Sequence, residues 1–159
     1  MSRIQAGSVE LTRRPVGLEE VVSRALASLG ALSEDVRVEV PEDLPLALAD
    51  AGLLERALAN LIANAVAWSP SPQSVCVSAQ LRPPDLELRV ADRGPGIPRA
   101  SREKMFQPFQ RLGDQGHTGV GLGLAIARGF VEAMGGEVLI DDTPGGGATL
   151  RILVAVAQP

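Results

Sequence analysis

The stretch VGLGLAIARGFVEAMGG, from Val120 to Gly136, changes character partway along. Glycine alternates with aliphatic residues at first, a helix-like run follows from Leu124 to Met134, and Gly135-Gly136 ends it. A glycine-rich loop that leads directly into a helix has two explanations. Either a phosphate group docks on the free N–H groups and positive dipole of the helix start, or the loop is an ordinary turn. The rest of the chain has to decide between them.

The composition describes a chain that can fold as one domain. It has 159 residues, of which 45% are hydrophobic, and a chain of this length buries roughly 68–70% of its unfolded surface. The one cysteine, Cys76, is expected to be a small buried residue, and the one histidine, His117, has no partners for a Cys/His metal site. The net charge of −4, without basic blocks, argues against nucleic-acid binding. No apolar run reaches the roughly 18 residues of a membrane span, so we expect a soluble, intracellular domain.

Hydrophobic periodicity predicts an α/β domain with about five strands and three main helices. The first helix is expected in the segment LEEVVSRALASLGAL, whose apolar positions run from Leu18 to Leu29. The second is expected from Ala51 to about Trp68, capped by Asp50 and ended by Ser69-Pro70. Short turns between strands favour a mixed, largely antiparallel sheet with the helices on one face. Strands are expected in the segments VRVEV, PLALAD, SVCVSAQL, LELRVAD, EVLIDD and ATLRILVAV.

A long segment without regular structure, from Arg93 to Thr118, is unusual for a compact domain. Loops longer than about 12–15 residues are uncommon and are often functional. This one lies between two glycine clusters, DRGPGIP and TGVGLG, and we expect at most a short helix around Ser101 to Met105. The segment and its flanks are therefore the place to look for a site.

The expected helix from Ala51 to Trp68 carries two asparagines on one face. Asn60, Asn64 and Trp68 are spaced four residues apart, so they share a face that differs from the apolar stripe. Asparagine is a poor helix former, and two carboxamide oxygens can ligate a hard cation such as magnesium, which also holds phosphates. Trp68 offers a flat surface for a base. The alternative is a solvated polar face with Trp68 in the core.

The segment VADRGPGIP places a carboxylate where a strand runs into a glycine turn. Asp92 at this point can accept a hydrogen bond from an exocyclic amine such as that of adenine. Gly94 and Gly96 would let the backbone come close to a flat ring. The alternative is an ordinary Asp-Gly turn.

Two further motifs lie between this turn and the helix that begins near Leu124. In MFQPFQRLGDQGHT, the aromatic residues Phe106 and Phe109 can pin a lid over a ligand, and Arg111 matches phosphate geometry. The alternative places both rings at the core edge and Arg111 in solvent. In TGVGLGLAI, glycines lead into the helix start, but the Walker Lys-Ser/Thr pair and a directly preceding strand are absent from the sequence. A nucleotide would therefore bind in another way.

Taken together, in this order and at these separations, the motifs resemble the catalytic ATP-binding domain of sensor histidine kinases, in the gyrase/Hsp90/MutL (GHKL) ATPase superfamily. The resemblance spans Leu18 to Val156. The segments PFQRLGD, GVGLGLAIARGFVEAMGG and DTPGGG resemble the potassium-responsive KdpD-type sensor kinases in particular. The matched positions are Asn60 and Asn64 (N box), Asp92, Gly94 and Gly96 (G1 box), Phe106 and Phe109 (F box), and Gly119, Gly121 and Gly123 (G2 box).

The resemblance implies a fold and a set of site residues. The fold would be an α/β (α+β) two-layer sandwich, the Bergerat ATP-binding fold, with a mixed five-stranded sheet, three helices and an ATP lid. ATP and Mg²⁺ would be the cofactors: Asn60 and Asn64 would hold the metal, and Asn60 and Arg111 would be catalytic. Asp92 would select adenine, and Trp68 would stack on it. Further nucleotide contacts would come from Gly94, Gly96, Phe106, Phe109, Gly119, Gly121, Gly123, Leu124 and Thr149, the last matching a threonine near the adenine.

The resemblance also implies a reaction and its partners. The γ-phosphoryl group of ATP would pass to a histidine on the dimerisation domain of a two-component sensor kinase, with a response regulator downstream. MSRIQAG resembles the end of the dimerisation helix, which assigns residues 1–14 to that helix end and a connector and residues 15–159 to the catalytic domain. His117 lies beside the G2 box, so autophosphorylation of the domain alone is not expected. The domain would be cytoplasmic, without membrane contact of its own, in a parent protein anchored in the membrane.

Two other functions stay open. Family members usually carry a basic residue and then an aromatic residue or histidine shortly after the second N-box asparagine, but this sequence has Ala67 and Trp68. The missing phosphate contact favours a degenerate nucleotide-binding domain that only interacts with a partner. An anti-sigma-factor-type serine kinase shares the domain, but it would not need the MSRIQAG segment.

Overall fold

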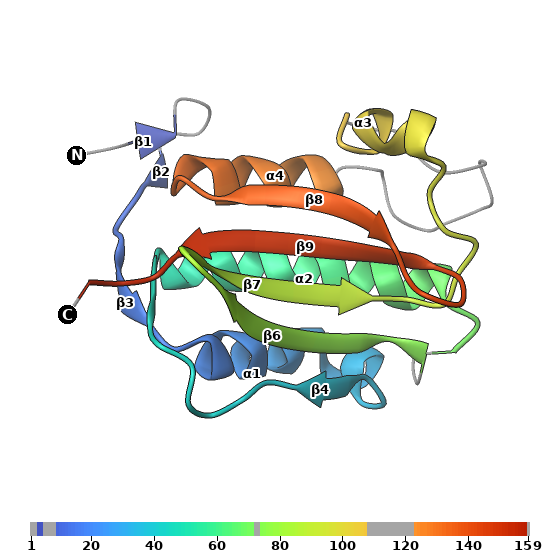
Figure 1. Cartoon of the computed structure of the whole chain (residues 1–159), viewed down its shortest axis with the longest axis horizontal. Coiled ribbons are helices and arrows are strands. Elements are labelled where there is room, and N and C mark those ends of the chain that lie inside the picture. The colour runs from blue at the N-terminus through green and yellow to red at the C-terminus, as the bar shows by residue number, and fades with distance from the viewer. Residues whose placement is uncertain (1–2, 5–8, 72–73, 108–122, 159) are drawn as a thin grey trace.

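The computed structural model describes residues 3–4, 9–71, 74–107 and 123–158, and they form two layers (Figure 1). One layer is a five-stranded sheet in which β4 runs parallel to β6 and the other neighbours are antiparallel. The mixed, largely antiparallel sheet predicted from the short turns is therefore confirmed. In spatial order the strands are β4 (Arg37–Glu39), β6 (Cys76–Arg82), β7 (Asp85–Ala91), β9 (Ala148–Ala155) and β8 (Glu137–Asp142).

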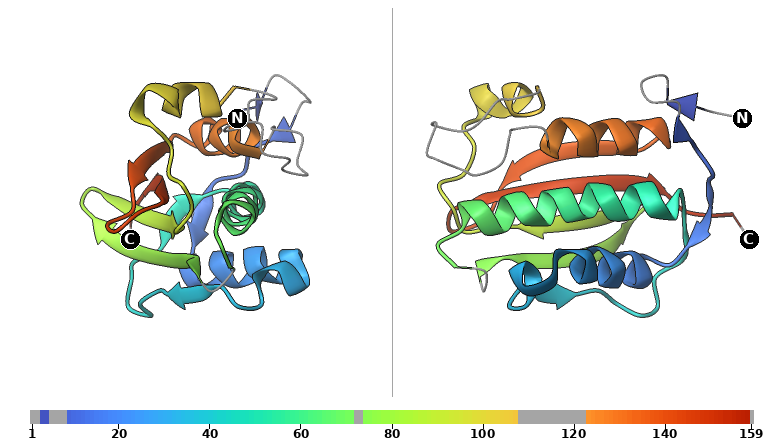
Figure 2. Two further views of the ribbon diagram at one scale, coloured as in Figure 1. Left: turned by 90° about the vertical axis from the view of Figure 1, so that its right-hand side faces the viewer. Right: turned by 180° about the vertical axis from the view of Figure 1, so that it is seen from behind.

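Helices form the second layer and cover one face of the sheet, as Figure 2 shows from behind. The three long helices of the described residues are α1 (Leu18–Leu29), α2 (Ala51–Trp68) and α4 (Gly123–Ala133). A short helix, α3 (Arg102–Met105), follows a 3-10 turn, η3 (Arg99–Ser101), and a second such turn, η1 (Gly30–Ser33), follows α1. The predicted helices, including the short one, are confirmed.

The middle helix, α2, forms the centre of the core. Leu54, Leu58 and Leu61 are fully buried on its inner side, and burying one such side chain contributes about 1.5–3 kcal/mol. The strands present their own alternate residues to it, because successive side chains of a strand point to opposite faces. The fully buried sheet residues on this side include Leu86, Leu88, Leu150 and Ile152.

Asp50 fixes the start of α2. Its Oδ1 accepts a hydrogen bond from the N–H of Leu53 at 3.0 Å, which is the predicted N-cap. Its Oδ2 accepts a second hydrogen bond, from the N–H of Thr12 at 2.9 Å. One carboxylate therefore caps the central helix and ties down the segment that precedes α1.

The residues before α1 differ from the prediction. Arg3–Ile4 (β1) is extended and pairs with Val9–Glu10 (β2), so the helix end predicted for MSRIQAG is wrong at these two residues, whose backbone groups pair across strands instead. Leu11 is only 8% exposed and belongs to the core. The division between residues 14 and 15 stays a prediction.

One predicted strand lies outside the main sheet. The segment PLALAD contains β5 (Ala47–Ala49), which pairs antiparallel with β3 (Arg14–Val16) as a separate two-stranded sheet. Cys76 also departs from the prediction, since its side chain is only half-buried.

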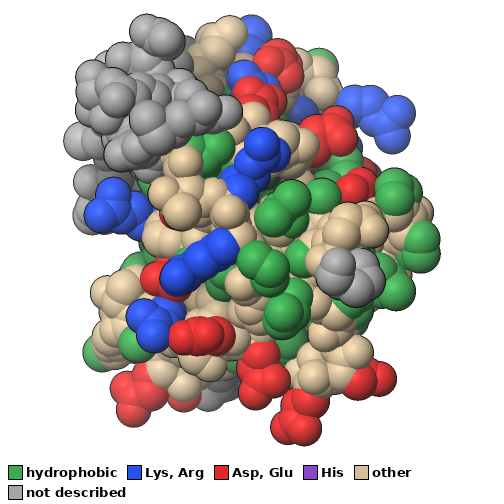
Figure 3. Space-filling view, turned by 90° about the vertical axis from the view of Figure 1, so that its left-hand side faces the viewer, with side chains coloured by type: hydrophobic (Ala, Val, Ile, Leu, Met, Phe, Trp, Pro, Cys, Tyr) green, Lys and Arg blue, Asp and Glu red, His purple; other side chains and the backbone are tan. Residues whose placement is uncertain are grey.

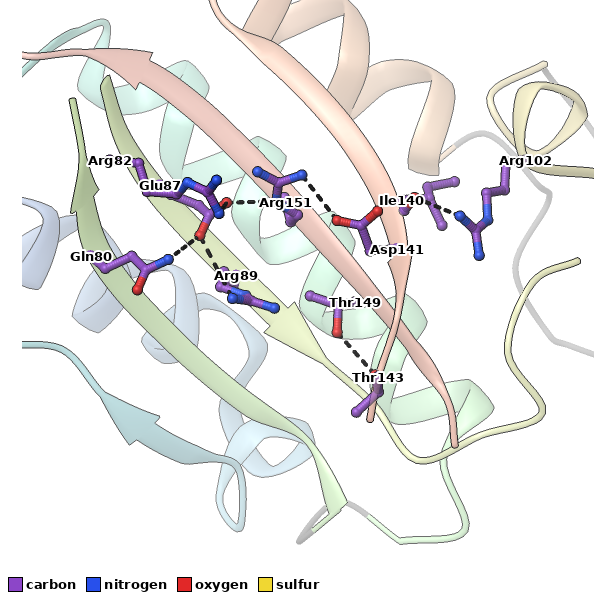
Figure 4. A network of polar contacts seen from close by, with 10 residues as sticks. All are labelled: Gln80, Arg82, Glu87, Arg89, Arg102, Ile140, Asp141, Thr143, Thr149 and Arg151. Carbon is purple, nitrogen blue, oxygen red and sulfur yellow. Dashed lines mark hydrogen bonds and ion pairs between the residues drawn. The ribbon is translucent and has the colours of Figure 1, made fainter. Parts of the chain in front are cut away.

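The face of the sheet opposite the helices is polar, and its charged side chains pair with one another (Figure 4). Glu87 is fully buried there, although no helix covers it. Gln80 donates to its Oε1 at 2.7 Å, and Arg151 donates to its Oε2 and also contacts Asp141 at 3.0 Å. Arginine side chains thus cover the carboxylate of Glu87 and donate hydrogen bonds to it. This face of the sheet therefore needs no covering helix.

The end of the molecule where both chain ends lie carries mixed side chains (Figures 1 and 3). Acidic side chains gather along the lower rim of the face drawn in Figure 3, and basic side chains are interspersed with acidic ones above it. In the described part of the chain, no helix has both the length and the apolar character that crossing a membrane requires.

We expect Asp50→Ala to destabilise the domain by about 1–3 kcal/mol, because it removes a helix cap and leaves the N–H of Thr12 without its acceptor. Urea unfolding followed by far-UV circular dichroism measures the loss. Asp43→Ala, at an exposed position before β5, is the control. Equal stabilities of the two variants would contradict this role for Asp50.

Candidate functional site

The elements that carry the predicted motifs meet at one end of the molecule, opposite the chain ends (Figures 1 and 2). The C-terminal half of α2, the end of β7 and the start of α4 converge there, with α3 beside them. Residues distant in sequence are thereby placed around one region, as a binding site requires.

The start of α4 packs against the asparagine face of α2. A methyl group added at Gly123 would lie 3.3 Å from Asn64 Nδ2 and 3.9 Å from Asn60 Cβ. Both asparagines are half-buried, and Leu124 is buried beneath the same junction. The positive end of the α4 dipole therefore lies beside two carboxamides, an arrangement that suits a phosphate chain and a hard cation.

The donor set for a metal here consists of amides. Among the described residues, no group of three or more His, Cys, Asp or Glu side chains could hold a metal ion. Magnesium commonly binds few protein ligands, because water molecules and substrate phosphates supply its other ligands. Asn60 and Asn64 fit this kind of site.

Asp92 is the most unusual side chain in this region. It is 1% exposed, and its Oδ1 accepts two backbone hydrogen bonds, from Gly94 at 2.9 Å and Ala148 at 3.0 Å. Its Oδ2 is buried and has no hydrogen-bond partner within the described residues. Burial raises the pKa of the Asp92 carboxyl, and the two N–H donors oppose this only in part. A buried acceptor without a partner is costly, and a ligand amine would satisfy it.

Glycines bring backbone close to Asp92 from two sides. A methyl group at Gly94 would lie 2.5 Å from the carbonyl oxygen of Trp68, and one at Gly147 would lie 2.0 Å from the carbonyl oxygen of Asp92 itself. Gly147 also has a φ of +112°, which other residues rarely adopt. Gly96, the second glycine of the turn, has a φ of +79°. Gly94 therefore lies where a side chain does not fit, and Gly96 lies where a positive φ favours glycine.

Trp68 and Ser69 connect the end of α2 to the same turn. Trp68 is half-buried and packs against the core, and its carbonyl faces Gly94. Ser69 Oγ accepts a hydrogen bond from the N–H of Arg93 at 3.2 Å. The end of the asparagine helix and the Asp92 turn thus form one unit.

The place predicted for Thr149, near the adenine, stays a prediction. Thr149 pairs with Ala91 across the sheet and shares the outer face with Arg151, while Leu150 points to the helices. Its hydroxyl pairs with that of Thr143 at 2.9 Å (Figure 4). The contact between β9 and the Asp92 carboxylate comes from the backbone N–H of Ala148 instead.

Phe106 is 7% exposed and ends α3 in an apolar setting, with Arg128 of α4 above its ring at 4.4 Å. The sequence placed Phe106 at a lid or at the core edge, and the structure places it in contact with α4. Other predicted positions lie outside the described residues: Phe109, Arg111, Gly119, Gly121 and the unassigned His117.

Sequence reasoning missed three contributors. The N–H of Ala148 binds Asp92, Gly147 leaves room for the Asp92 carbonyl, and the glycine run from Gly145 was the available signal. Arg102 ties the segment after the turn to β8, donating to the carbonyls of Ile97 and Ile140 and to Asp142 at 2.7 Å. An arginine in a polar stretch gives no comparable signal.

Comparison with known proteins bears on this arrangement. Residues 49–158 match the family model described as histidine kinase-, DNA gyrase B- and HSP90-like ATPase. The chain belongs to this family. The matched region contains α2, the Asp92 turn and α4, which are the elements that form the candidate site. The predicted family is confirmed.

Individual members of the ATPase family are similar over nearly the whole chain. The sensor protein KdpD of Mycobacterium tuberculosis is 46% identical over 164 residues, covering 99% of this chain and 19% of that protein. The chain therefore spans about a fifth of the length of this curated relative. The predicted resemblance to KdpD-type kinases is confirmed.

Solved structures with the same fold include that of a sensor histidine kinase. The mycobacterial sensor histidine kinase MprB is 31% identical with a TM-score of 0.76, over 93% of this chain and all of that one. The full-length ShkA structure in complex with AMPPNP is 29% identical with a TM-score of 0.78, over 95% of this chain and 33% of that one. The predicted two-layer α/β fold is confirmed.

In this ATPase domain we expect Gly147→Ala to cost more stability than Gly146→Ala. Both glycines have positive φ, so both variants incur backbone strain of about 1–3 kcal/mol. Only a methyl group at Gly147 meets an atom, whereas one at Gly146 has nothing within 4 Å. The difference between the two variants in chemical denaturation measures the close approach to Asp92. Equal losses would rule out that steric contact.

We further expect Asp92→Asn to stabilise the ligand-free domain at neutral pH by about 1–3 kcal/mol, since it removes a buried, unpaired charge. Because the pKa of Asp92 is raised in the folded state, its ionised form destabilises the fold above that pKa. The difference between Asp92→Asn and wild type should shrink as pH falls through it and the wild-type carboxyl is protonated. Thermal unfolding at several pH values tests this, and a pH-independent difference would contradict it.

Proposed function

We propose that this chain binds Mg-ATP and transfers its γ-phosphoryl group to a histidine on the dimerisation domain of a two-component sensor kinase. The observation that carries the nucleotide part is the buried, unpartnered Oδ2 of Asp92. The kinase part draws its support from similarity to sensor histidine kinases.

Adenine fits the environment of Asp92. The exocyclic amine of adenine donates hydrogen bonds, while guanine carries a carbonyl at the same ring position and would face the carboxylate with an acceptor. Gly94 and Gly96 remove side chains from the turn beside it, and Trp68 lies one turn along α2 from Asn64. Asp92 would select the base, and Trp68 would stack on it. Thr149 would lie near the adenine, next to Ala148, whose N–H binds Asp92.

The phosphates would lie between Asn64 and the start of α4. Gly123 faces Asn64 and Asn60, and the free N–H groups of the helix start would receive phosphate oxygens. Asn60 and Asn64 would hold Mg²⁺, which supplies charge neutralisation at the phosphates when bound. Gly119 and Gly121 precede the helix start in sequence, and we assign them to the same role together with Leu124.

In the transfer, a ring nitrogen of the acceptor histidine attacks the γ-phosphorus, the bond to the β-γ bridging oxygen breaks, and ADP leaves as the imidazole loses its proton. The domain mainly positions groups and stabilises charge. Arg111 would neutralise charge at the γ-phosphate, and Asn60 would orient the reacting group. Asn60 has no carboxylate to activate water, which fits weak ATP hydrolysis.

Ala67 supports a second candidate function. It is exposed at the end of α2, where relatives usually carry a basic residue, so one phosphate contact is missing. A domain that binds nucleotide or a partner without catalysing transfer would have this property. In the kinase reading, the dimerisation domain of the parent and a response regulator are the partners.

The unmodified domain should bind ATP in preference to GTP, and Asp92→Asn should weaken ATP about 10- to 150-fold. A hydrogen bond to a charged group contributes roughly 1.5–3 kcal/mol, which sets this range. Isothermal titration calorimetry measures both. Asp43→Asn, which alters an exposed carboxylate before β5, is the control. Equal binding of ATP and GTP by the unmodified domain would sink the assignment of Asp92.

Incubated alone with labelled ATP, the domain should gain no acid-labile phosphate, whereas the dimerisation domain of its parent protein, added in trans, should become labelled on histidine. Asn64→Ala should lose this transfer while keeping affinity for metal-free adenosine, because it removes a metal ligand and not a base contact. Phosphate analysis after acid and alkali treatment, with calorimetry of adenosine, provides the measurements. Tight Mg-ATP binding with no transfer in trans would favour the binding-only function.

A further inference from the structure

Arg128 of α4 makes two contacts with α3 that the proposed chemistry does not use. Its Nη1 lies 3.0 Å from Glu103 Oε1, and its guanidinium carbon lies 4.4 Å from the centre of the Phe106 ring. A weaker contact on its own helix, 3.9 Å to Glu132, orients the same side chain. Glu103 and Phe106 belong to the turn of helix that α3 forms and to its end. Arg128 therefore fastens α3 onto α4 through charge and through the aromatic face.

The other end of α3 is fastened elsewhere. Arg102 donates to the carbonyl of Ile97, which ends the glycine turn after Asp92, and to the carboxylate of Asp142 on β8. It also donates to the carbonyl of Ile140 on β8 (Figure 4). Through Arg102 the helix α3 is linked to the side of the site that contains Asp92. Through Arg128 it is linked to α4, whose first residue faces Asn64.

The geometry points to Arg128 as a positioning residue for the nucleotide: it sets the separation between the Asp92 side of the site and the start of α4, where the phosphates would bind. This inference rests on the proposed function, since it assumes a ligand that contacts both sides. Arg128 itself would touch neither the base nor the phosphates.

The physical reason is preorganisation. A ligand that spans two walls binds more tightly when the walls are already held at the right separation, because less order has to be imposed on binding. A ligand that contacts one wall gains nothing from it. Mg-ATP reaches from Asp92 to the start of α4 in the proposed pose, whereas adenosine contacts the Asp92 side. Loss of the Arg128 contacts should therefore weaken Mg-ATP and leave adenosine unaffected.

A purely structural role would behave differently. If Arg128 only stabilised the fold, its replacement would lower the stability of the domain and weaken Mg-ATP and adenosine to the same extent. The carboxylate of Glu103 is 78% exposed and its ion pair contributes little to stability, so Glu103→Gln should fold normally. This variant, together with Arg128→Met and Arg128→Lys, separates positioning from folding. Arg24→Met is the matched control, because Arg24 forms a comparable 2.9 Å ion pair with Glu20 on α1, away from the site.

Calorimetry with Mg-ATP and with metal-free adenosine is the experiment. We expect Arg128→Met to weaken Mg-ATP about 5- to 10-fold and Glu103→Gln about 2- to 3-fold, the range that one cation–π contact and one ion pair allow. Arg128→Lys should restore most of the affinity. Adenosine binding should not change in any of them, and the fluorescence of Trp68, the only tryptophan, should match wild type. Arg24→Met should bind both ligands as wild type does.

Two results would overturn the inference. Mg-ATP affinity unchanged in Arg128→Met, with wild type binding both ligands, would refute the role of Arg128 and leave the proposed function intact. Equal losses for Mg-ATP and adenosine would show general loosening of the fold instead. A wild-type domain that binds neither ligand would refute the proposed function, and this inference with it.

Discussion

The carboxylate of Asp92 is the constraint on which the architecture of the site depends. One oxygen bridges two parts of the chain, the glycine turn through Gly94 and strand β9 through Ala148, while the other oxygen is buried without a partner. The glycines around it exist because no side chain fits between Asp92, Trp68 and the turn before β9. An arrangement that leaves a buried acceptor unpaired is unfavourable for folding alone. A ligand that donates a hydrogen bond to Oδ2 of Asp92 would remove this cost.

The sequence predicted those features of the fold that depend on local pattern. The length of α2, its cap at Asp50 and its apolar stripe follow from helical periodicity and from the hydrogen-bonding capacity of one side chain. The same holds for the strands of the main sheet and for the turn between Arg82 and Asp85. The sequence also showed that Asp92 lies at the end of a strand. It did not show the donor from Ala148, because that residue is 56 positions away in the chain.

The errors have physical reasons. Arg3–Ile4 carries no pattern strong enough to fix helix or strand, and pairing with Val9–Glu10 decides it. Arg102 and Arg128 were invisible for another reason: arginine is common on surfaces, and only the fold shows that these two hold α3.

The helix α2 also connects the two ends of the domain. It begins where Asp50 binds the backbone of Thr12, in the segment preceding α1, and ends at Trp68 beside the Asp92 turn. At 18 residues and about 1.5 Å of rise for each, it is a rod roughly 27 Å long. Its flanks are packed against α1, α4 and the sheet, so it cannot bend easily. The segment before α1 is therefore joined by one hydrogen bond to the start of the packed helix whose C-terminal half carries Asn60 and Asn64.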